Sequence, residues 1–196
     1  MTNAVVTMSC AFAAVVTVSC SGSPFSGRAS AAPGNAAARV ERGKYLVSVA
    51  GCSDCHTPMK LGPSGPEPDM ARFLSGHPDA IGALPPARAS LPWLWTGAAT
   101  NTAFSGPWGI SYAANLTPDQ NTGLGIWTEQ LFIAAIRNGR HMGTSREILP
   151  PMPWPALRNA SDEDLRSMYA YLRTLTPVTN RVPDPEIAAA PTAAGK

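Results

Sequence analysis

The segment GCSDCHTP places two cysteines three positions apart, with a histidine directly after the second. Cys52, Cys55 and His56 at this spacing suit three chemistries: half of a zinc site, a thioredoxin-like redox pair, or covalent attachment of c-type haem. A structural zinc site needs four ligands, yet no second C-x-x-C is present and His77 and His141 each stand alone. A redox pair is expected beside a βαβ pattern, whereas this motif follows a helical pattern and precedes proline-rich chain. Haem attachment fits best, because each thiol can form a thioether with the haem and His56 can ligate its iron.

The sixth ligand of such an iron has to come from elsewhere in the chain. The methionines beyond the N-terminal region are Met59, Met70, Met142, Met152 and Met168. Met59 follows the histidine too closely to reach the opposite haem face, and Met168 fits the apolar stripe of a helix. Met142 follows His141 in a flexible setting that offers either residue. Met152 lies between two prolines, in a loop too rigid to become helical, which can present a thioether at a fixed place. We expect Met152 to ligate the iron; the alternative is that it only fills a gap in the core.

Three segments carry the apolar periodicity and the end signals of helices. They span residues 36–50, 128–138 and 162–175. Gly43 interrupts the first and predicts a close packing contact there, because glycine costs a helix about 1 kcal/mol relative to alanine. Thr128 and Gly139 are the expected caps of the second helix. Ser161 caps the third, and Pro177 follows its end.

The remaining composition predicts long loops rather than a regular α/β sheet. Residues 57–126 hold ten of the 20 prolines and show no sustained periodicity, so we expect an irregular segment wrapped around something. LPPMPWP, from Leu149, is a second and shorter rigid loop. Asp119, Asn121 and Gly123 resemble the start of a calcium loop, but the required Glu is absent and a turn accounts for them better. Charged residues make up only 14% and the net charge is +2 with no basic block, which argues against a nucleic-acid partner.

The N-terminus has the character of an export signal. Residues 4–18 are almost wholly apolar, too few for a bilayer-spanning helix, and Ala29-Ser30-Ala31 matches an A-x-A cleavage site, although no Lys or Arg precedes the apolar run. The alternative is a lipoprotein signal that ends before Cys20, with lipid on that cysteine. We therefore expect a signal at 1–31, a haem domain at 32–178 and an extended or disordered tail at 179–196, in a periplasmic protein.

Four segments of the chain carry a family resemblance. RGKYLVSVAGCSDCHTP, ANLTPDQNTGLGIWTEQLFIAAIRNGRH, LPPMPW and SDEDLRSMYAYLRTLTPV together resemble a bacterial monohaem c-type cytochrome of class I. The resemblance is strongest to the haem domains of dehydrogenase-associated cytochrome subunits. It implies an all-α, cytochrome c-like fold, with three or more helices around one covalently bound haem and long Pro/Gly-rich loops. It also implies that Met152 is the axial methionine, and that Gly43 lies where the first and last helices cross, against Tyr169 or Tyr171.

The implied function is that of an electron carrier rather than an enzyme. One haem c with His56 and Met152 on its iron leaves no open position for a substrate. The resemblance implies redox partner proteins: a dehydrogenase as donor and a terminal oxidase or another cytochrome as acceptor. A peroxidase-like enzyme would need a distal acid–base group, for which His141 is the candidate. A gas-binding sensor would need an iron that Met152 does not ligate.

Other residues allow weaker expectations. Trp127 and three arginines can contact the haem propionates, although solvated charges at a helix end are an equal account of the arginines. The arginines are Arg137, Arg140 and Arg146. The tryptophans Trp93, Trp95 and Trp108 in the long insertion either cover the haem pocket or form a docking surface.

Overall fold

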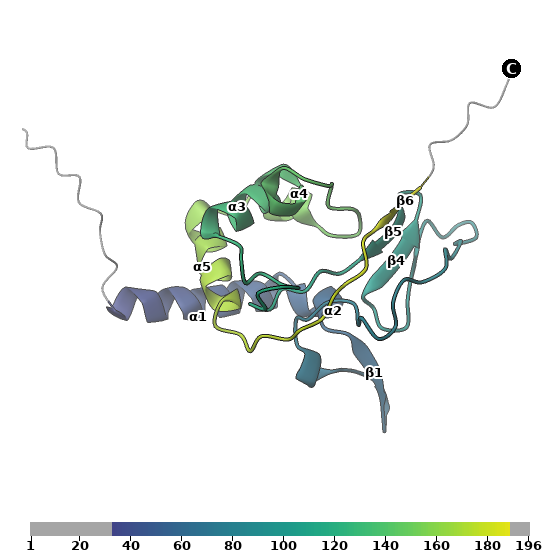
Figure 1. Ribbon diagram of the computed structural model, residues 1–196, viewed down its shortest axis with the longest axis horizontal. Coiled ribbons are helices and arrows are strands. Elements are labelled where there is room, and N and C mark those ends of the chain that lie inside the picture. Colours follow the sequence, from purple (N-terminus) through teal and green to yellow (C-terminus); the bar gives the residue numbers. More distant parts are fainter. Residues whose placement is uncertain (1–32, 189–196) are drawn as a thin grey trace, which may run out of the picture. The chain divides into compact units, whose positions relative to one another are not determined.

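The computed structural model describes residues 33–188, which form five α-helices, two 3₁₀ turns and six short strands. The helices are α1 (Pro33–Val49), α2 (Cys52–His56), α3 (Glu129–Asn138), α4 (Trp154–Leu157) and α5 (Asp162–Leu172), and the 3₁₀ turns are η1 (Met70–Arg72) and η2 (His141–Gly143). The strands are β1 (Met59–Gly62), β2 (Gly65–Pro68), β3 (Thr96–Gly97), β4 (Ala103–Gly106), β5 (Gly109–Tyr112) and β6 (Glu186–Ile187) (Figure 1).

The three predicted helices are present as α1, α3 and α5, and their predicted caps are confirmed. The Thr128 hydroxyl accepts a hydrogen bond from the N–H of Leu131 at 3.2 Å, which satisfies a free donor at the start of α3. Gly139 ends α3 in the left-handed region, with φ of 64°. The Ser161 hydroxyl caps α5 in the same way. Helix α5 ends at Leu172 rather than at residue 175.

Helices α1 and α5 cross at Gly43, as the family resemblance implied (Figure 1). A Cβ atom at Gly43 would overlap the backbone carbonyl of Ser167 and lie 2.8 Å from the Cβ of Tyr171. Only glycine lets the two backbones approach this closely. Around the crossing, apolar side chains from α1, α3 and α5 form the main core, with Val47, Phe132, Ile136, Leu165 and Leu172 all buried.

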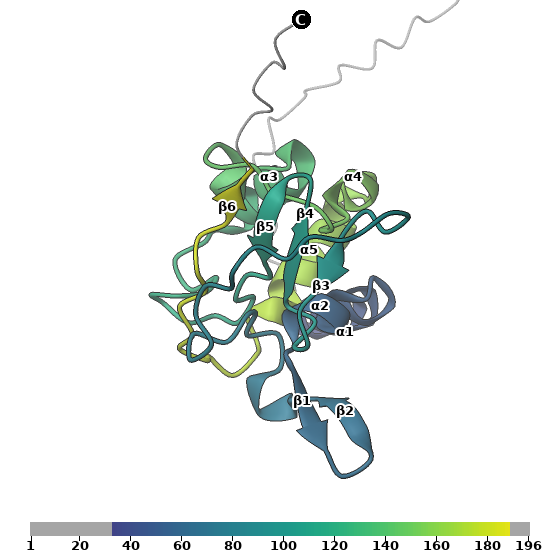
Figure 2. The ribbon, with the colours of Figure 1, turned by 90° about the vertical axis from the view of Figure 1, so that its right-hand side faces the viewer.

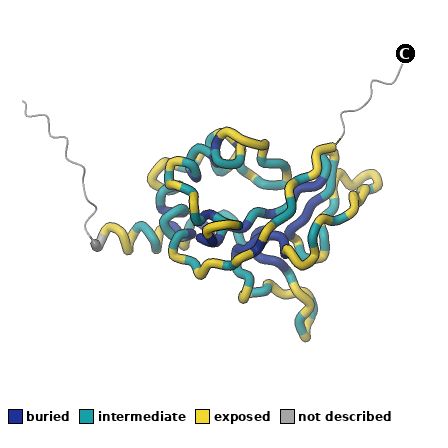
Figure 3. Tube along the Cα trace, in the orientation of Figure 1, coloured by how far each residue is buried: buried dark blue, intermediate teal, exposed yellow. Residues whose placement is uncertain are grey.

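The expected all-α fold was too narrow a description, because residues 57–126 contain most of two antiparallel sheets. Strands β1 and β2 form a hairpin that projects from the domain, and β3, β4, β5 and β6 form a four-stranded sheet in that order (Figure 2). The strands are two to four residues long, so their period-2 signal is too short to detect among the prolines and glycines. Buried residues lie in β4 and β5 as well as in the helical core (Figure 3).

The segment after α5 runs back along the domain. Asn180 is fully buried: its side-chain amide donates to the carbonyls of Ser75 and His77, and its Oδ1 accepts from the N–H of Asp79 at 2.8 Å. Farther on, Ile187 in β6 pairs with Gly109 in β5. Residues 179–188, which were expected to form an extended or disordered tail, therefore contribute a buried side chain and a strand.

Some expectations lie outside the described residues. These are the signal at 1–31, the lipid on Cys20, and residues 189–196 of the tail. Within residues 33–188, no helix combines the length and the apolar character that a membrane span requires.

Candidate haem-attachment site

The short helix α2 carries both cysteines and the histidine of the motif. It starts after Gly51, whose left-handed conformation, with φ of 66°, ends the run of α1 and turns the chain into a new helix. Cys52, Cys55 and His56 occupy positions i, i+3 and i+4 of α2 and therefore share one of its faces. The sequence motif thus becomes two thiols and an imidazole side by side.

His56 is buried, with 8% of its surface exposed, and its ring is held by a backbone group. Its Nδ1 lies 2.7 Å from the carbonyl oxygen of Ala114. Because a carbonyl only accepts, Nδ1 carries the proton and Nε2 keeps its lone pair. Burial lowers the pKa of His56, and the hydrogen bond to Ala114 opposes this only partly, so the ring is neutral as a metal ligand must be.

The backbone of His56 is supported by the insertion as well. The N–H of Gly76 donates to the His56 carbonyl at 2.8 Å. Leu116 then donates to the carbonyl of Leu74 at 2.9 Å, so the segment around residue 75 lies between α2 and the chain that follows β5. Residues 72–77 and 113–116 therefore build the wall behind the imidazole. Sequence reasoning missed this wall, because backbone groups of Ala and Gly carry no pattern.

The two thiols are protonated at neutral pH. Burial raises the pKa of Cys52 to about 11, and burial together with the charge of Asp54 raises the pKa of Cys55 above its usual value. A reactive redox pair needs the opposite, a thiolate stabilised by a lowered pKa. The site therefore disfavours the thioredoxin-like alternative. Across residues 33–188, no three His, Cys, Asp or Glu side chains gather as a metal site.

Met152 lies in a loop that is fixed at both sides. The Ser111 hydroxyl donates to the carbonyl of Pro150 at 2.6 Å, which ties the loop to β5. After Met152 the chain enters α4, and the ring of Trp154 packs so closely on Gly139 that a Cβ there would overlap it. Met152 is non-helical, as expected, but the rigid loop expected at 149–155 is shorter, because α4 begins at Trp154 directly after Pro153. The methionine itself is half-buried against the helical core.

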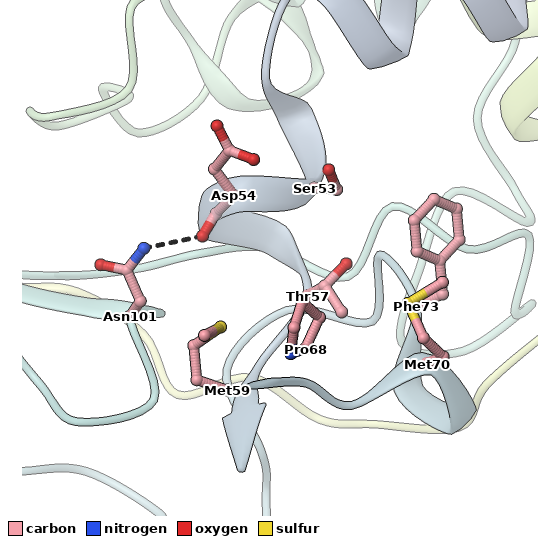
Figure 4. A pocket seen from close by; sticks show the side chains of 8 residues that line it. All are labelled: Ser53, Asp54, Thr57, Met59, Pro68, Met70, Phe73 and Asn101. Atoms are coloured by element: carbon pink, nitrogen blue, oxygen red, sulfur yellow. Dashed lines mark hydrogen bonds between the residues drawn. The ribbon is translucent and has the colours of Figure 1, made fainter. Parts of the chain in front are cut away.

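The other methionines have different surroundings. Met168 is buried in the core, and Met142 lies in the η2 turn with φ of 52°. Met59 and Met70 line a groove of about 430 Å³ bounded also by Ser53 and Asp54, residues of α2 that interleave with the thiol-bearing positions (Figure 4). Among the methionines of residues 33–188, Met152 is the one that lies in a fixed loop and also packs against the core cluster, as Cys52 does.

The core around the site is only partly closed. Many of its apolar members are half-buried rather than buried, including Cys52, Leu116, Trp127 and Met152. Such a surface fits a large apolar group, which would remove it from water. The donor set, the neutral imidazole and this apolar surface together match the requirements of haem c.

Two of the three arginines that were expected to contact the haem propionates form ion pairs with carboxylates of the chain instead. Arg137 pairs with Asp162 at 2.6 Å, and Arg140 pairs with Glu147 at 3.1 Å. These two therefore behave as surface charges at the end of α3. Burial lowers the pKa of Arg146. The ring of Trp127 packs edge-on against that of His141, with 5.0 Å between the ring centroids.

The fold and the site are those of a cytochrome c-like domain whose helix α2 carries a C-x-x-C-H motif. No family model matches the chain. Among curated proteins it is 30% identical over 135 residues to the fructose dehydrogenase cytochrome subunit of Gluconobacter japonicus, covering 69% of this chain and 21% of that protein. It is also 30% identical over 151 residues to the cytochrome c subunit of a quinone alcohol dehydrogenase from Gluconobacter oxydans, covering 75% of this chain and 24% of that protein.

A third relative is the gluconate 2-dehydrogenase cytochrome c subunit of Pantoea cypripedii, 30% identical over 151 residues, which are 76% of this chain and 26% of that protein. The chain is thus homologous to cytochrome c subunits of bacterial dehydrogenases, and its resemblance to their haem domains is confirmed. It spans about a quarter of the length of these three relatives.

Proposed function

We propose that this protein is an electron-transfer c-type cytochrome with one haem, held by thioethers to Cys52 and Cys55. His56 and Met152 would be the two side chains that hold its iron. The observation that carries the proposal is the geometry of α2, where two protonated thiols share a face with a buried imidazole whose Nδ1 is already engaged. Similarity to dehydrogenase cytochrome subunits supports the same function.

The protein's residues hold and shield the group rather than perform chemistry on a substrate. The haem supplies one-electron chemistry when bound. Ala114 orients His56 through Nδ1 and makes Nε2 the better donor. The soft thioether of Met152 and the apolar core would both favour the reduced iron, and two protein ligands would leave no site for a substrate.

The partner and the compartment follow from the same proposal. The donor is a dehydrogenase, by analogy with the relatives, and the acceptor is a terminal oxidase or another cytochrome. Transfer needs only a brief contact of small area, below about 1,200 Å². Attachment of haem c suits export to the periplasm, in agreement with the apolar N-terminal segment.

The attachment is tested by intact mass. The protein is produced in a host with a haem-attachment system, as the parent chain, as Cys52→Ser/Cys55→Ser, and as Ser53→Ala. Ser53 is in the same helix but carries no thiol. We expect the mass of one haem on the parent and on Ser53→Ala after denaturation, and none on the double variant. Haem that survives denaturation in the double variant would contradict the proposal.

The electron-transfer role is tested by voltammetry of the protein on an electrode. We expect a reversible one-electron wave that hydrogen peroxide does not amplify. A catalytic current with peroxide would contradict the assignment as an electron carrier and would indicate a peroxidase-like enzyme instead.

A further inference from the structure

The segment between residues 88 and 97, here called the Trp93 loop, exposes a run of large apolar side chains. Leu91 is 94% exposed, Trp93 72% and Leu94 67%. Single exposed apolar residues are ordinary on a protein surface, but three within four positions concentrate apolar surface on one short loop. None of these residues belongs to the core cluster that Cys52 and Met152 contact, so the exposed side chains need a different account.

The loop is held in a defined conformation. Its base enters β3, where Thr96 pairs with Ser105 of β4, at the edge of the four-stranded sheet (Figure 2). The Ser105 hydroxyl donates to the carbonyl of Ala87 at 2.7 Å, and the ring of Trp95 packs edge-on against Phe104. Trp95 thus anchors the loop, while Trp93 and its neighbours face outward on a preorganised support.

The charges along the sequence on both sides of the loop are of one sign. Residues 80–118 contain no Asp or Glu, and Arg88 is their single charged residue. Arg88 lines a groove of about 650 Å³ together with Trp93, Leu94 and Trp95. A guanidinium binds phosphate well, and no carboxylate in this stretch of chain repels an anionic surface.

We propose that the Trp93 loop binds the surface of a lipid bilayer, with Leu91, Trp93 and Leu94 in the interfacial region and Arg88 at a headgroup phosphate. Tryptophan and leucine on one side and a basic residue beside them are the groups that such interfaces accept. The loop offers a protein partner few polar groups to fix a register, whereas a lipid surface requires none. The proposal does not depend on the haem ligands.

The test measures partition of the exported holoprotein onto sucrose-loaded vesicles. All proteins carry Cys20→Ser, so a lipid on that cysteine cannot account for binding. The variants are Trp93→Ser/Leu94→Ser, Arg88→Gln, and Leu61→Ser as the matched control, since Leu61 is 86% exposed in the β1–β2 hairpin. Vesicles are phosphatidylcholine alone or mixed with phosphatidylglycerol.

We expect the Cys20→Ser protein, which serves as the reference, and its Leu61→Ser variant to bind mixed vesicles equally. The partition coefficient of the Trp93→Ser/Leu94→Ser variant should fall about tenfold or more. Arg88→Gln should remove the preference for phosphatidylglycerol. The proposal is overturned if the reference stays in solution, or if Leu61→Ser weakens binding as much as the double variant does. It is also overturned if the double variant binds normally but is reduced more slowly by a dehydrogenase, because the loop then contacts a protein.

Discussion

His56 is positioned by backbone atoms rather than by side chains. Its ring donates to Ala114, and its own carbonyl accepts from Gly76. The motif was enough to predict Cys52, Cys55 and His56 as one set, because spacing alone places them on one helical face. It could not predict their support, since any residue can supply a carbonyl or an amide at the right place.

Substitution of Met152 and of Met142 shows which of the two methionines ligates the iron. Met152→Ala should open the sixth position of the iron, so that CO binds and the reduction potential falls, because the thioether that favours reduced iron is gone. Met142→Ala should change neither property, because Met142, in the η2 turn, is not the proposed ligand. CO titration and potentiometry measure both. The ligand assignment is wrong if Met142→Ala has these effects and Met152→Ala is silent.

Asp119 predicts an acid dependence of stability. Hydrogen bonds from Thr122 and Thr179 lower the pKa of Asp119 from 3.8 to about 2. A carboxyl with a lower pKa in the folded state stabilises the fold above its unfolded pKa, and this stability is lost as pH falls through the folded value. Urea unfolding of the holoprotein should therefore show that, between pH 5 and pH 2, the free energy of unfolding falls less for Asp119→Asn than for the parent. Parallel curves would show that this carboxyl does not contribute.

The elements that the sequence predicted are those with local end signals. Thr128, Gly139 and Ser161 mark helix ends through contacts within a few residues. The sheets have no such signals, because β3 and β6 are two residues long and β6 joins β5 from the far end of the chain. Asn180 is similar: its partners lie about a hundred residues away, in a loop that no periodicity could connect to it.

The α1–α5 crossing makes a quantitative prediction at Gly43. Gly43→Ala adds a methyl group where the Ser167 carbonyl already fills the space, and overpacking of this kind costs about 1–3 kcal/mol. The gain in helix propensity is smaller, about 1 kcal/mol, so we expect a net loss of stability. Lys44→Ala, at the next and exposed position of α1, is the control and should be nearly neutral. Equal free energies of unfolding for the two variants would show that the helices can separate without cost.

At the scale of the whole domain, the core predicts that the proposed haem contributes to stability. The core cluster leaves many members half-buried, so the polypeptide alone keeps apolar surface in water. The Cys52→Ser/Cys55→Ser protein, prepared without haem, should bind a hydrophobic dye and unfold at lower urea than the holoprotein, with Ser53→Ala as the control that keeps haem. A haem-free protein that unfolds as the holoprotein does, without binding dye, would contradict this account of the core.

The most direct test of the carrier function is the absorption spectrum of the oxidised and reduced holoprotein, with and without CO. Two axial ligands from the protein predict a low-spin spectrum with the weak iron–sulfur charge-transfer band, and no change on adding CO. A high-spin spectrum that shifts with CO would mean an open iron, and the protein would then be a haem enzyme or a gas sensor rather than an electron carrier.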